Sequence, residues 1–138
     1  MMGQFTHSLD AKKRLFIPAK HREQLGETFI ITRSTDPCLK VYSAAEWAKY
    51  TERLESLPSV EGREIIRFVY SNAIEVQPDS QGRVLISSEL LSYAGITKSA
   101  VIAGCGYYAE IWSEEMWEER HSSENVEAIQ KKMIDLAL

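Results

Sequence analysis

The sequence predicts a mainly β, α+β fold made of two pseudo-symmetric halves, with linking helices between them and a C-terminal helix after them. The first observation is an internal repeat, because a shift of 69 residues places Asp10 on Asp79 and Arg14 on Arg83. The second is that short β-branched runs recur in both copies, and the third is that residues typical of helix ends recur at matching positions. The chain has 138 residues, 44% of them hydrophobic, so it can bury a core.

The repeat divides the chain into four parts. The first copy and the helix after it take up residues 3–57, a linking helix 58–72, the second copy 73–120 and a helical tail 121–138. The likeness between the copies ends after Trp117, because the positions that would continue the apolar face of a helix are charged in the second copy. We therefore expect a different helix in the tail.

Each copy begins with two short strands around a tight turn. The strands are expected at 5–9 and 14–17 in the first copy, and at 74–76 and 83–86 in the second. The turns carry the pattern Asp-x-x-x-Arg, in which Asp favours the start of a turn, and Gly82 can take the positive φ of a tight connection. We therefore predict that each pair of strands forms a local hairpin.

A brief helix and two more strands complete each copy. The helices are expected at 18–25 and 87–94, where proline or serine begins each helix and Gly26 or Gly95 ends it. The β-branched runs that predict the remaining strands are 29–32 with 39–42, and 100–103 with 109–112.

Two helices follow the first copy. Ser43 and Glu46 form a capping box that opens the first of them, and Pro58 ends it. The second is expected at 59–70 and links the copies. The apolar side chains that we expect to face inward from this second helix are Ile65, Phe68 and Val69.

The tail carries a separate apolar stripe at helical spacing, formed by Val126, Ile129, Met133 and Leu136. Such stripes usually belong to a core, so we expect this helix to pack on the body of its own subunit. The open alternative is that the stripe docks on a neighbouring subunit.

Charge is distributed unevenly along the chain. The formal net charge is −4, which taken alone argues against indiscriminate binding to nucleic acid or anionic membranes. The segment from Ser113 to Leu138 carries that −4, and the first 112 residues sum to zero. Within them, the segment from Asp10 to Arg22 is +4, so the average conceals a basic segment near the N-terminus.

Catalytic and metal-binding signatures are scarce, so we expect no enzyme activity, no cofactor and no metal. The chain contains none of the common hydrolase, metalloprotease or phosphate-loop motifs. The run from Gly104 to Ala109 imitates a dinucleotide fingerprint, but it leads into a strand and is interpreted as a hairpin turn. His7, His21 and His121 lie on separate elements and are expected at the surface.

The cysteines and the apolar runs predict a cytoplasmic protein. Cys38 and Cys105 stand far apart, with no C-x-x-C pattern and no histidine at metal-ligand spacing, so we expect idle or buried thiols. The N-terminus has no apolar run, and nowhere do 18 apolar residues follow one another. We expect no signal peptide and no membrane contact.

The two Asp-x-x-x-Arg turns are the strongest local signal, and two interpretations of them are open. In the structural one, Asp10 and Asp79 accept backbone N–H groups and pair with the arginines, while Gly82 shapes its turn. In the functional one, a rigid ribbon projects basic side chains into a DNA major groove, where arginine binds guanine and lysine neutralises phosphate. The candidate DNA-binding residues are Lys12, Lys13, Arg14 and Arg83.

The two turns are unequal. The sequence around the second turn has three acidic residues and a single basic one, Arg83. We therefore expect the first turn to carry most of the DNA binding. Lys13 also occupies the position that matches Gly82. A lysine in a left-handed turn would be strained by roughly 1–2 kcal/mol.

Four segments together resemble the MraZ family of bacterial regulators: Ser8–Lys20, Asp36–Tyr42 with Glu46 and Trp47, Asp79–Ile86 with the Tyr93-Ala-Gly-Ile run, and Glu110–Trp112. The resemblance covers about residues 3 to 120. It implies an AbrB-like, swapped-hairpin, double-ψ-like β-barrel built from both halves of the chain and assembled into a ring-shaped homo-oligomer.

The resemblance also implies a function. It points to sequence-specific binding to repeated promoter sites on double-stranded DNA ahead of a cell division and cell wall gene cluster, usually as a repressor, in the cytoplasm at the nucleoid. Residue by residue, Asp10, Arg14, Asp79 and Arg83 match the family motif. The alternative is an interaction or scaffold module in which the hairpins are structural and the C-terminal helix docks a partner.

Overall fold

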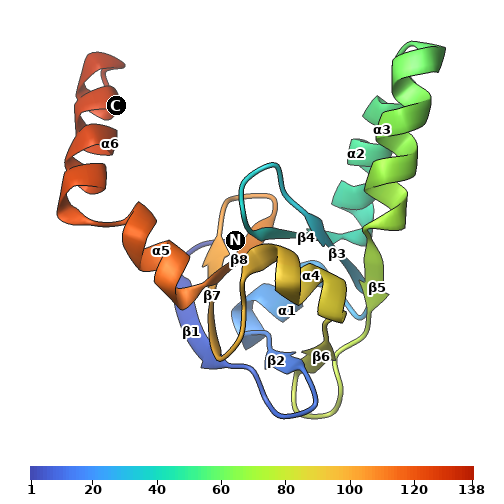
Figure 1. Cartoon of the computed structure of the whole chain (residues 1–138), viewed down its shortest axis with the longest axis horizontal. Helices are drawn as coiled ribbons and strands as arrows, with labels where there is room; N and C mark the ends of the chain where they lie inside the picture. The colour runs from blue at the N-terminus through green and yellow to red at the C-terminus, as the bar shows by residue number, and fades with distance from the viewer.

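Eight strands form the body of the protein in two antiparallel sheets (Figure 1), in a computed structural model that describes residues 1–138. The larger sheet has the order β1-β7-β8-β4-β3-β5, and β2 pairs with β6 in a separate two-stranded ribbon. The strands are β1 Gln4–Ser8, β2 Arg14–Phe16, β3 Phe29–Arg33, β4 Leu39–Ser43, β5 Ile74–Val76, β6 Arg83–Leu85, β7 Ser99–Gly104 and β8 Ala109–Ser113.

Six helices accompany the strands, which confirms the α+β prediction. They are α1 Ala19–Leu25, α2 Ala44–Glu55, α3 Ser59–Ser71, α4 Ser88–Ala94, α5 Glu114–Arg120 and α6 Ser123–Asp135. No helix of the chain combines the length and the apolar character needed to cross a membrane.

The local hairpins that the turn pattern alone predicts at the start of each copy are wrong, whereas the swapped-hairpin arrangement that the family resemblance implies is confirmed, because these strands pair with the other half. β1 pairs with β7, β5 pairs with β3, and β2 pairs with β6. The turns themselves are formed, but the strands that they join extend into different ladders. The later hairpins, β3 with β4 and β7 with β8, are local as predicted.

The exchange of strands makes the body pseudo-symmetric. In the β2–β6 ribbon, Arg14 pairs with Leu85 and Phe16 with Arg83, and the repeat shift converts one pair into the other. Leu15 and Val84 pair with each other at the centre of the ribbon. The internal repeat of the sequence is therefore a two-fold relation in space.

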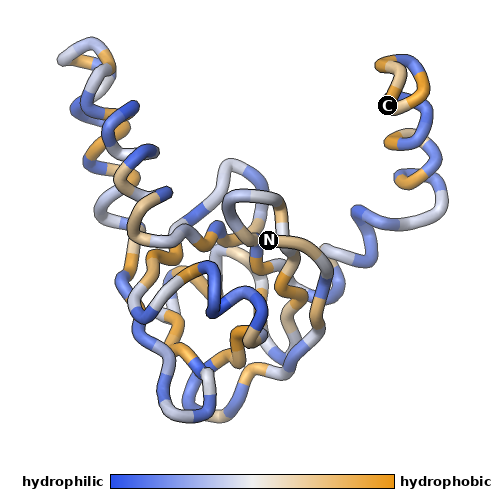
Figure 2. Tube along the Cα trace, turned by 180° about the vertical axis from the view of Figure 1, so that it is seen from behind, coloured by the Kyte–Doolittle hydropathy of each residue, from blue (hydrophilic) through white to orange (hydrophobic).

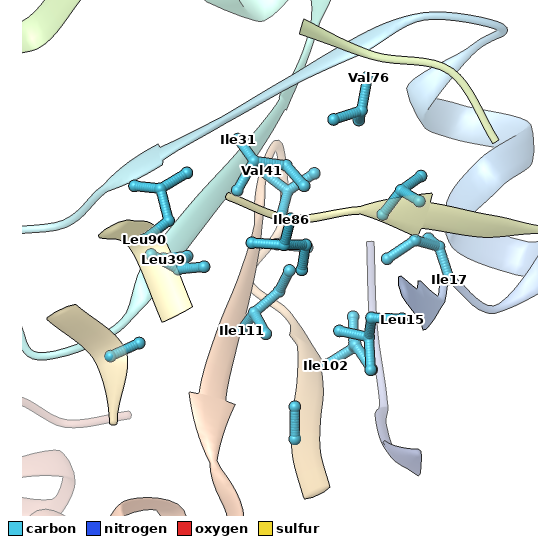
Figure 3. Close-up of a cluster of buried hydrophobic side chains, with 14 of the residues drawn as sticks. Leu15, Ile17, Ile31, Leu39, Val41, Val76, Ile86, Leu90, Ile102 and Ile111 are labelled. Carbon is cyan, nitrogen blue, oxygen red and sulfur yellow. The ribbon is translucent and has the colours of Figure 1, made fainter. Parts of the chain in front are cut away.

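One core is shared by both halves (Figure 3). Its 18 buried residues come from strands and helices of both copies. Leu15 and Ile111, one from each half, are both fully buried. Because this single cluster takes side chains from both copies, neither half has a complete core of its own.

The helix ends follow the sequence closely. The Ser43 hydroxyl accepts a hydrogen bond from the Glu46 N–H at 3.2 Å, and the Ser87 hydroxyl accepts one from the Leu90 N–H at 3.3 Å. Gly26 and Gly95 end α1 and α4 with φ values of 88° and 68°. These predictions are confirmed.

The two sheets and the short helices α1 and α4 form the body that we call the barrel. The helices α2 and α3 form one arm, and α5 and α6 form another, on its opposite edges (Figure 1). Apolar residues concentrate in the barrel, whereas the arms alternate between polar and apolar positions (Figure 2). The predicted inward face of α3 does point toward the sheet, since Ile65, Phe68 and Val69 line a cavity there, but it is only partly covered, and Phe68 is 52% exposed. These side chains reach the margin of the barrel without entering its core.

The tail helix also departs from the expectation. No residue of α6 is buried, and Ile129 and Met133 are exposed. The expected packing of this stripe on its own subunit is therefore wrong. The physical reason is that α5 ends at Arg120, after which α6 leaves the barrel.

One histidine and the two cysteines are removed from solvent to different degrees. His21 is buried, which corrects the expected surface position, and its Nε2 lies 3.2 Å from the carbonyl oxygen of Met2. Cys38 is buried as well, and burial raises the pKa of its thiol to about 12. Burial also raises the pKa of the Cys105 thiol, to about 11, so both cysteines stay protonated at neutral pH.

Candidate nucleic-acid interface

The two Asp-x-x-x-Arg turns lie at the end of the barrel opposite the helical arms (Figure 1). They come together because the strands that follow them, β2 and β6, pair with each other. The ribbon is closed at both ends by equivalent backbone hydrogen bonds: the Ile17 N–H donates to the Gly82 carbonyl at 2.9 Å, and the Ile86 N–H donates to the Lys13 carbonyl at 3.1 Å. The fold thus joins two motifs that are far apart in the sequence.

Each aspartate organises its own turn. One carboxylate oxygen of Asp10 accepts hydrogen bonds from the backbone N–H groups of Lys12 at 2.9 Å and Arg14 at 2.8 Å. The other oxygen accepts a hydrogen bond from Arg14 Nε at 2.8 Å. The backbone N–H of Arg14, and then its side chain, hold the pKa of Asp10 below its ordinary value, even though partial burial opposes the shift.

The second turn repeats this geometry. Asp79 accepts hydrogen bonds from the N–H groups of Gln81 at 2.9 Å and Arg83 at 3.0 Å, and from Arg83 Nε at 3.0 Å. The same cause, led by the backbone N–H of Arg83, lowers the pKa of Asp79. Both carboxylates are therefore ionised at neutral pH and fix the shape of their turns.

The two turns are also connected to each other by charge. Arg14 Nη1 lies 3.8 Å from the Asp79 carboxylate, and Arg83 Nη1 lies 3.7 Å from the Asp10 carboxylate. All four side chains are about one-third exposed, so solvent screens these contacts and each adds little stability. Their effect is to hold both guanidinium groups in one orientation, a cluster that no local pattern predicts.

Lys13 and Gly82 give the turns different freedom. Both have a left-handed backbone, with φ of 65° for Lys13 and 80° for Gly82. A Cβ on Gly82 would lie 2.8 Å from Arg22 Cζ, whose guanidinium is anchored by a hydrogen bond from Nε to the Ile17 carbonyl at 2.8 Å. The second turn therefore favours glycine, since any side chain there would displace Arg22, whereas Lys13 accepts backbone strain at an exposed position.

The outer face of the ribbon holds two further side chains that belong to no motif of the sequence. Leu15 and Val84 point into the core, so their strand neighbours face outward. Among these are Phe16, which is half-buried, and Leu85, which is 62% exposed. The alternation of the strands could have identified both, because every second residue of 14–17 and 83–86 is buried.

The end of the ribbon keeps positive charge after its internal ion pairs are formed, so it can bind a polyanion. Lys12 and Lys13 are exposed and take part in no ion pair, while Arg14 and Arg83 are held by the aspartates. Four cations thus accompany two carboxylates on a two-stranded ribbon with apolar side chains between them. This combination suits phosphate contact by the lysines, and base-edge contact by the arginines and by Leu85.

Comparison with known proteins agrees with this geometry. A family model described as "MraZ protein, putative antitoxin-like" matches residues 1–65 and 69–137. The chain is 43% identical to the "Transcriptional regulator MraZ" of Moorella thermoacetica, over 97% of this chain and 96% of the relative. It is 44% identical to the protein of that name from Caldanaerobacter subterraneus subsp. tengcongensis, over 91% and 90% of the two chains. The protein of that name from Carboxydothermus hydrogenoformans is 41% identical, over 99% of each chain. The chain therefore belongs to the MraZ family of transcriptional regulators.

Proposed function

We propose that this chain is a sequence-specific repressor that binds repeated promoter sites on double-stranded DNA through its β2–β6 ribbon. The observation that carries the proposal is the meeting of both Asp-x-x-x-Arg turns at one end of the barrel, away from the arms. By resemblance, the target is a cell division and cell wall gene cluster, and the protein acts in the cytoplasm at the nucleoid.

The residues of the ribbon divide the work of binding. Lys12 and Lys13 neutralise phosphates, because their side chains are exposed and unpaired. Arg14 and Arg83 read base edges with the ends of their guanidinium groups, since the aspartates hold only Nε within hydrogen-bond distance. Fixing an arginine before binding reduces the conformational entropy that is lost on DNA.

The turn residues act indirectly. Asp10 and Asp79 keep the turns closed and the arginines aligned, and Gly82 allows Arg22 to pack beneath the second turn. The first turn is the stronger DNA contact, because it carries Lys12 and Lys13 where the second carries Gln81 and Gly82.

Useful affinity requires several ribbons to act together. One ribbon offers few contacts, whereas a ring of copies on spaced repeats raises the effective concentration of each further contact. Exposed apolar residues of α3 and α6, such as Val60 and Ile134, support such a ring, since the two helices lie on opposite edges of one molecule. A head-to-tail contact between unlike faces closes into a ring when its rotation permits.

Binding to the DNA upstream of the chain's own gene tests the proposal, with fluorescence anisotropy measured at several salt concentrations. For Arg14→Ala we expect about tenfold weaker binding and, for Lys12→Gln, a salt slope reduced by about 1. Arg63→Ala on the exposed side of α3 is the matched control and should bind like the wild type. If Arg14→Ala keeps its thermal unfolding midpoint and binds with unchanged affinity and salt slope, the ribbon is not the DNA contact.

A docking module is the second candidate function, and the exposed stripe of α6 is the observation that favours it. In that case the hairpins are structural and the tail helix binds another protein. The two functions differ in whether removal of the tail reduces assembly and DNA affinity.

A further inference from the structure

A cavity of about 350 Å³ lies where the outer ends of β3 and β4 meet the α2–α3 arm and α4. Its volume is at the lower end of the range of small-molecule sites, and half of its twelve lining residues are apolar. It is separate from the β2–β6 ribbon and contains none of the residues of the two turns. Its chemistry is therefore unexplained by DNA binding.

Arg33 is the central charged residue of this cavity. Its guanidinium carbon lies 3.9 Å from the ring centre of Tyr93 and 5.0 Å from that of Phe68, so aromatic rings from two helices flank it. Its Nε is buried and has no hydrogen-bond partner, and no carboxylate lies within ion-pair distance. A buried donor that carries charge is costly unless an acceptor satisfies it.

The positive charge of the cavity has no counter-ion in the protein. Lys40 is a second lining cation, and no Asp or Glu lines the cavity. Glu110 is the cross-strand neighbour of Lys40, but it forms no ion pair with it and instead accepts a hydrogen bond from Trp112 Nε1 at 3.0 Å. The Lys40 ammonium lies over the ring of Tyr108, 4.6 Å from its centre.

Flat apolar walls accompany the two cations. Tyr42 and Tyr50 both line the cavity, and their rings are stacked with 5.5 Å between centres and 15° between planes. Phe68 adds a half-exposed face from α3. The Tyr93 hydroxyl lies within hydrogen-bond distance of the carbonyls of Ser34 and Asp36, at 2.7 and 2.9 Å, which fixes the ring beside Arg33.

We propose that this cavity is a binding site for a small organic anion that carries a planar ring. Arg33 and Lys40 neutralise its carboxylate or phosphate, and the Arg33 Nε–H donates to one of its oxygens. Tyr42, Tyr50 and Phe68 contact the ring. The site links the arm to the barrel, so occupancy fixes the arm in place.

The inference goes beyond the proposed DNA binding and does not depend on it, because its readout needs no DNA. A carboxylate and a phosphate share the chemistry that the cavity recognises. Separate probes for the two headgroups distinguish them.

Titration of the full chain by ¹H–¹⁵N NMR and calorimetry tests the proposal, with benzoate and phenyl phosphate as probes. We expect saturable shifts at the amides of Thr32, Arg33 and Tyr93 with at least one probe. Benzyl alcohol, which lacks the charge, and acetate or inorganic phosphate, which lack the ring, should each bind at least about tenfold more weakly.

Variants assign the binding to the cavity. Arg33→Gln and Lys40→Gln should each weaken the stronger probe by about tenfold or more, since each removes one cation. Arg63→Gln and Lys49→Gln remove the same charges from the outer surfaces of the arm and should leave affinity unchanged. Lys40→Gln keeps the test informative if Arg33→Gln does not fold.

Three results would overturn the proposal. One is a linear, non-saturating response to both probes. The second is equal binding by folded Lys40→Gln, Arg33→Gln and wild type. The third is that the chemical shifts of the cavity amides change with protein concentration and not with added probe, in step with the mass measured by light scattering. Another copy of the chain would then fill the cavity.

Discussion

At the residue scale, the two turns differ most at one position. Lys13 holds a φ of 65° with an exposed side chain, and Gly82 holds a φ of 80° with Arg22 packed where a side chain would stand. The first turn thus combines strain with a charge at the end of the barrel that we propose contacts DNA. Substitutions of Lys13 can therefore remove the charge with or without the backbone strain, which separates an effect on stability from an effect on DNA affinity.

Lys13→Gly should raise stability and weaken DNA binding together. Relief of about 1–2 kcal/mol of left-handed strain is offset in part by the roughly 0.5–1 kcal/mol that glycine flexibility costs, so the free energy of unfolding should rise by about 0.5–1 kcal/mol. Loss of the charge should reduce the salt slope of DNA binding by about 1. Urea unfolding and anisotropy titrations measure the two effects.

Lys13→Gln is the matched control, since it removes the charge and keeps the left-handed strain. It should leave the free energy of unfolding unchanged and lower the salt slope as Lys13→Gly does. Equal stability of both variants would show that the backbone at this turn relaxes and stores no strain.

At the element scale, equivalent helices of the two copies begin alike and end differently. Ser43 caps α2 and Ser113 caps α5 through the same hydroxyl-to-N–H hydrogen bond, at 3.2 and 3.1 Å. α2 runs for 12 residues and returns through α3, whereas α5 runs for 7 and leads outward into α6. The repeated segments therefore form the barrel, and the segments that follow each copy, which are not alike in sequence, form two different arms.

Removal of residues 122–138 should leave the barrel folded, because no residue of α6 is buried. The thermal unfolding midpoint should stay within a few degrees of the wild type, since surface changes usually move stability by about 0.5 kcal/mol or less. If α6 joins copies into a ring, light scattering should show smaller assemblies and DNA affinity should fall with them. If α6 docks another protein instead, assembly and DNA binding should both be unchanged.

Point variants separate loss of the stripe from loss of the helix. Ile129→Ser with Met133→Ser removes apolar contacts from the exposed stripe, and Gln130→Ser with Lys131→Ser makes the same number of changes beside it. Only the first pair should reproduce the truncation. Reproduction by both pairs would assign the effect to helix stability.

At the scale of the whole molecule, local features followed from residue patterns, whereas the exchange of strands followed only from the family resemblance, which implies a swapped-hairpin arrangement. The contacts of Asp10 with Arg14 lie within four residues, and helix caps lie within three, so their patterns predict them. Leu15 fits a partner strand in its own copy or in the other, because the repeat makes the two alternatives similar in pattern. The buried position of His21 depends on the N-terminal segment that folds over it, through Met2.

The same reasoning applies to the arms. A stripe such as that of α6 indicates that a face is to be covered, but periodicity does not identify what covers it. The cavity beside Arg33 collects side chains from β3, β4, α2, α3 and α4, which no single motif contains. Sequence reasoning found the turn residues because they repeat, and missed Arg33 because its partners come together only in the folded chain.

The interleaved barrel predicts that its halves do not fold as separate monomers, because each half supplies partner strands to the other. In residues 1–72 alone, β1 loses β7 and β2 loses β6, and 11 of the 18 residues in the core that contains Leu15 and Ile17 are missing. The two-fold relation allows a second copy of residues 1–72 to stand where residues 73–138 normally lie. Residues 1–72 should therefore be unfolded when dilute and gain structure as a dimer, and the two halves mixed together should restore the barrel. Circular dichroism at increasing concentration, with sedimentation to give mass, measures this coupling. A monomeric 1–72 fragment with a concentration-independent, well-dispersed amide spectrum would show instead that one half carries a sufficient core by itself.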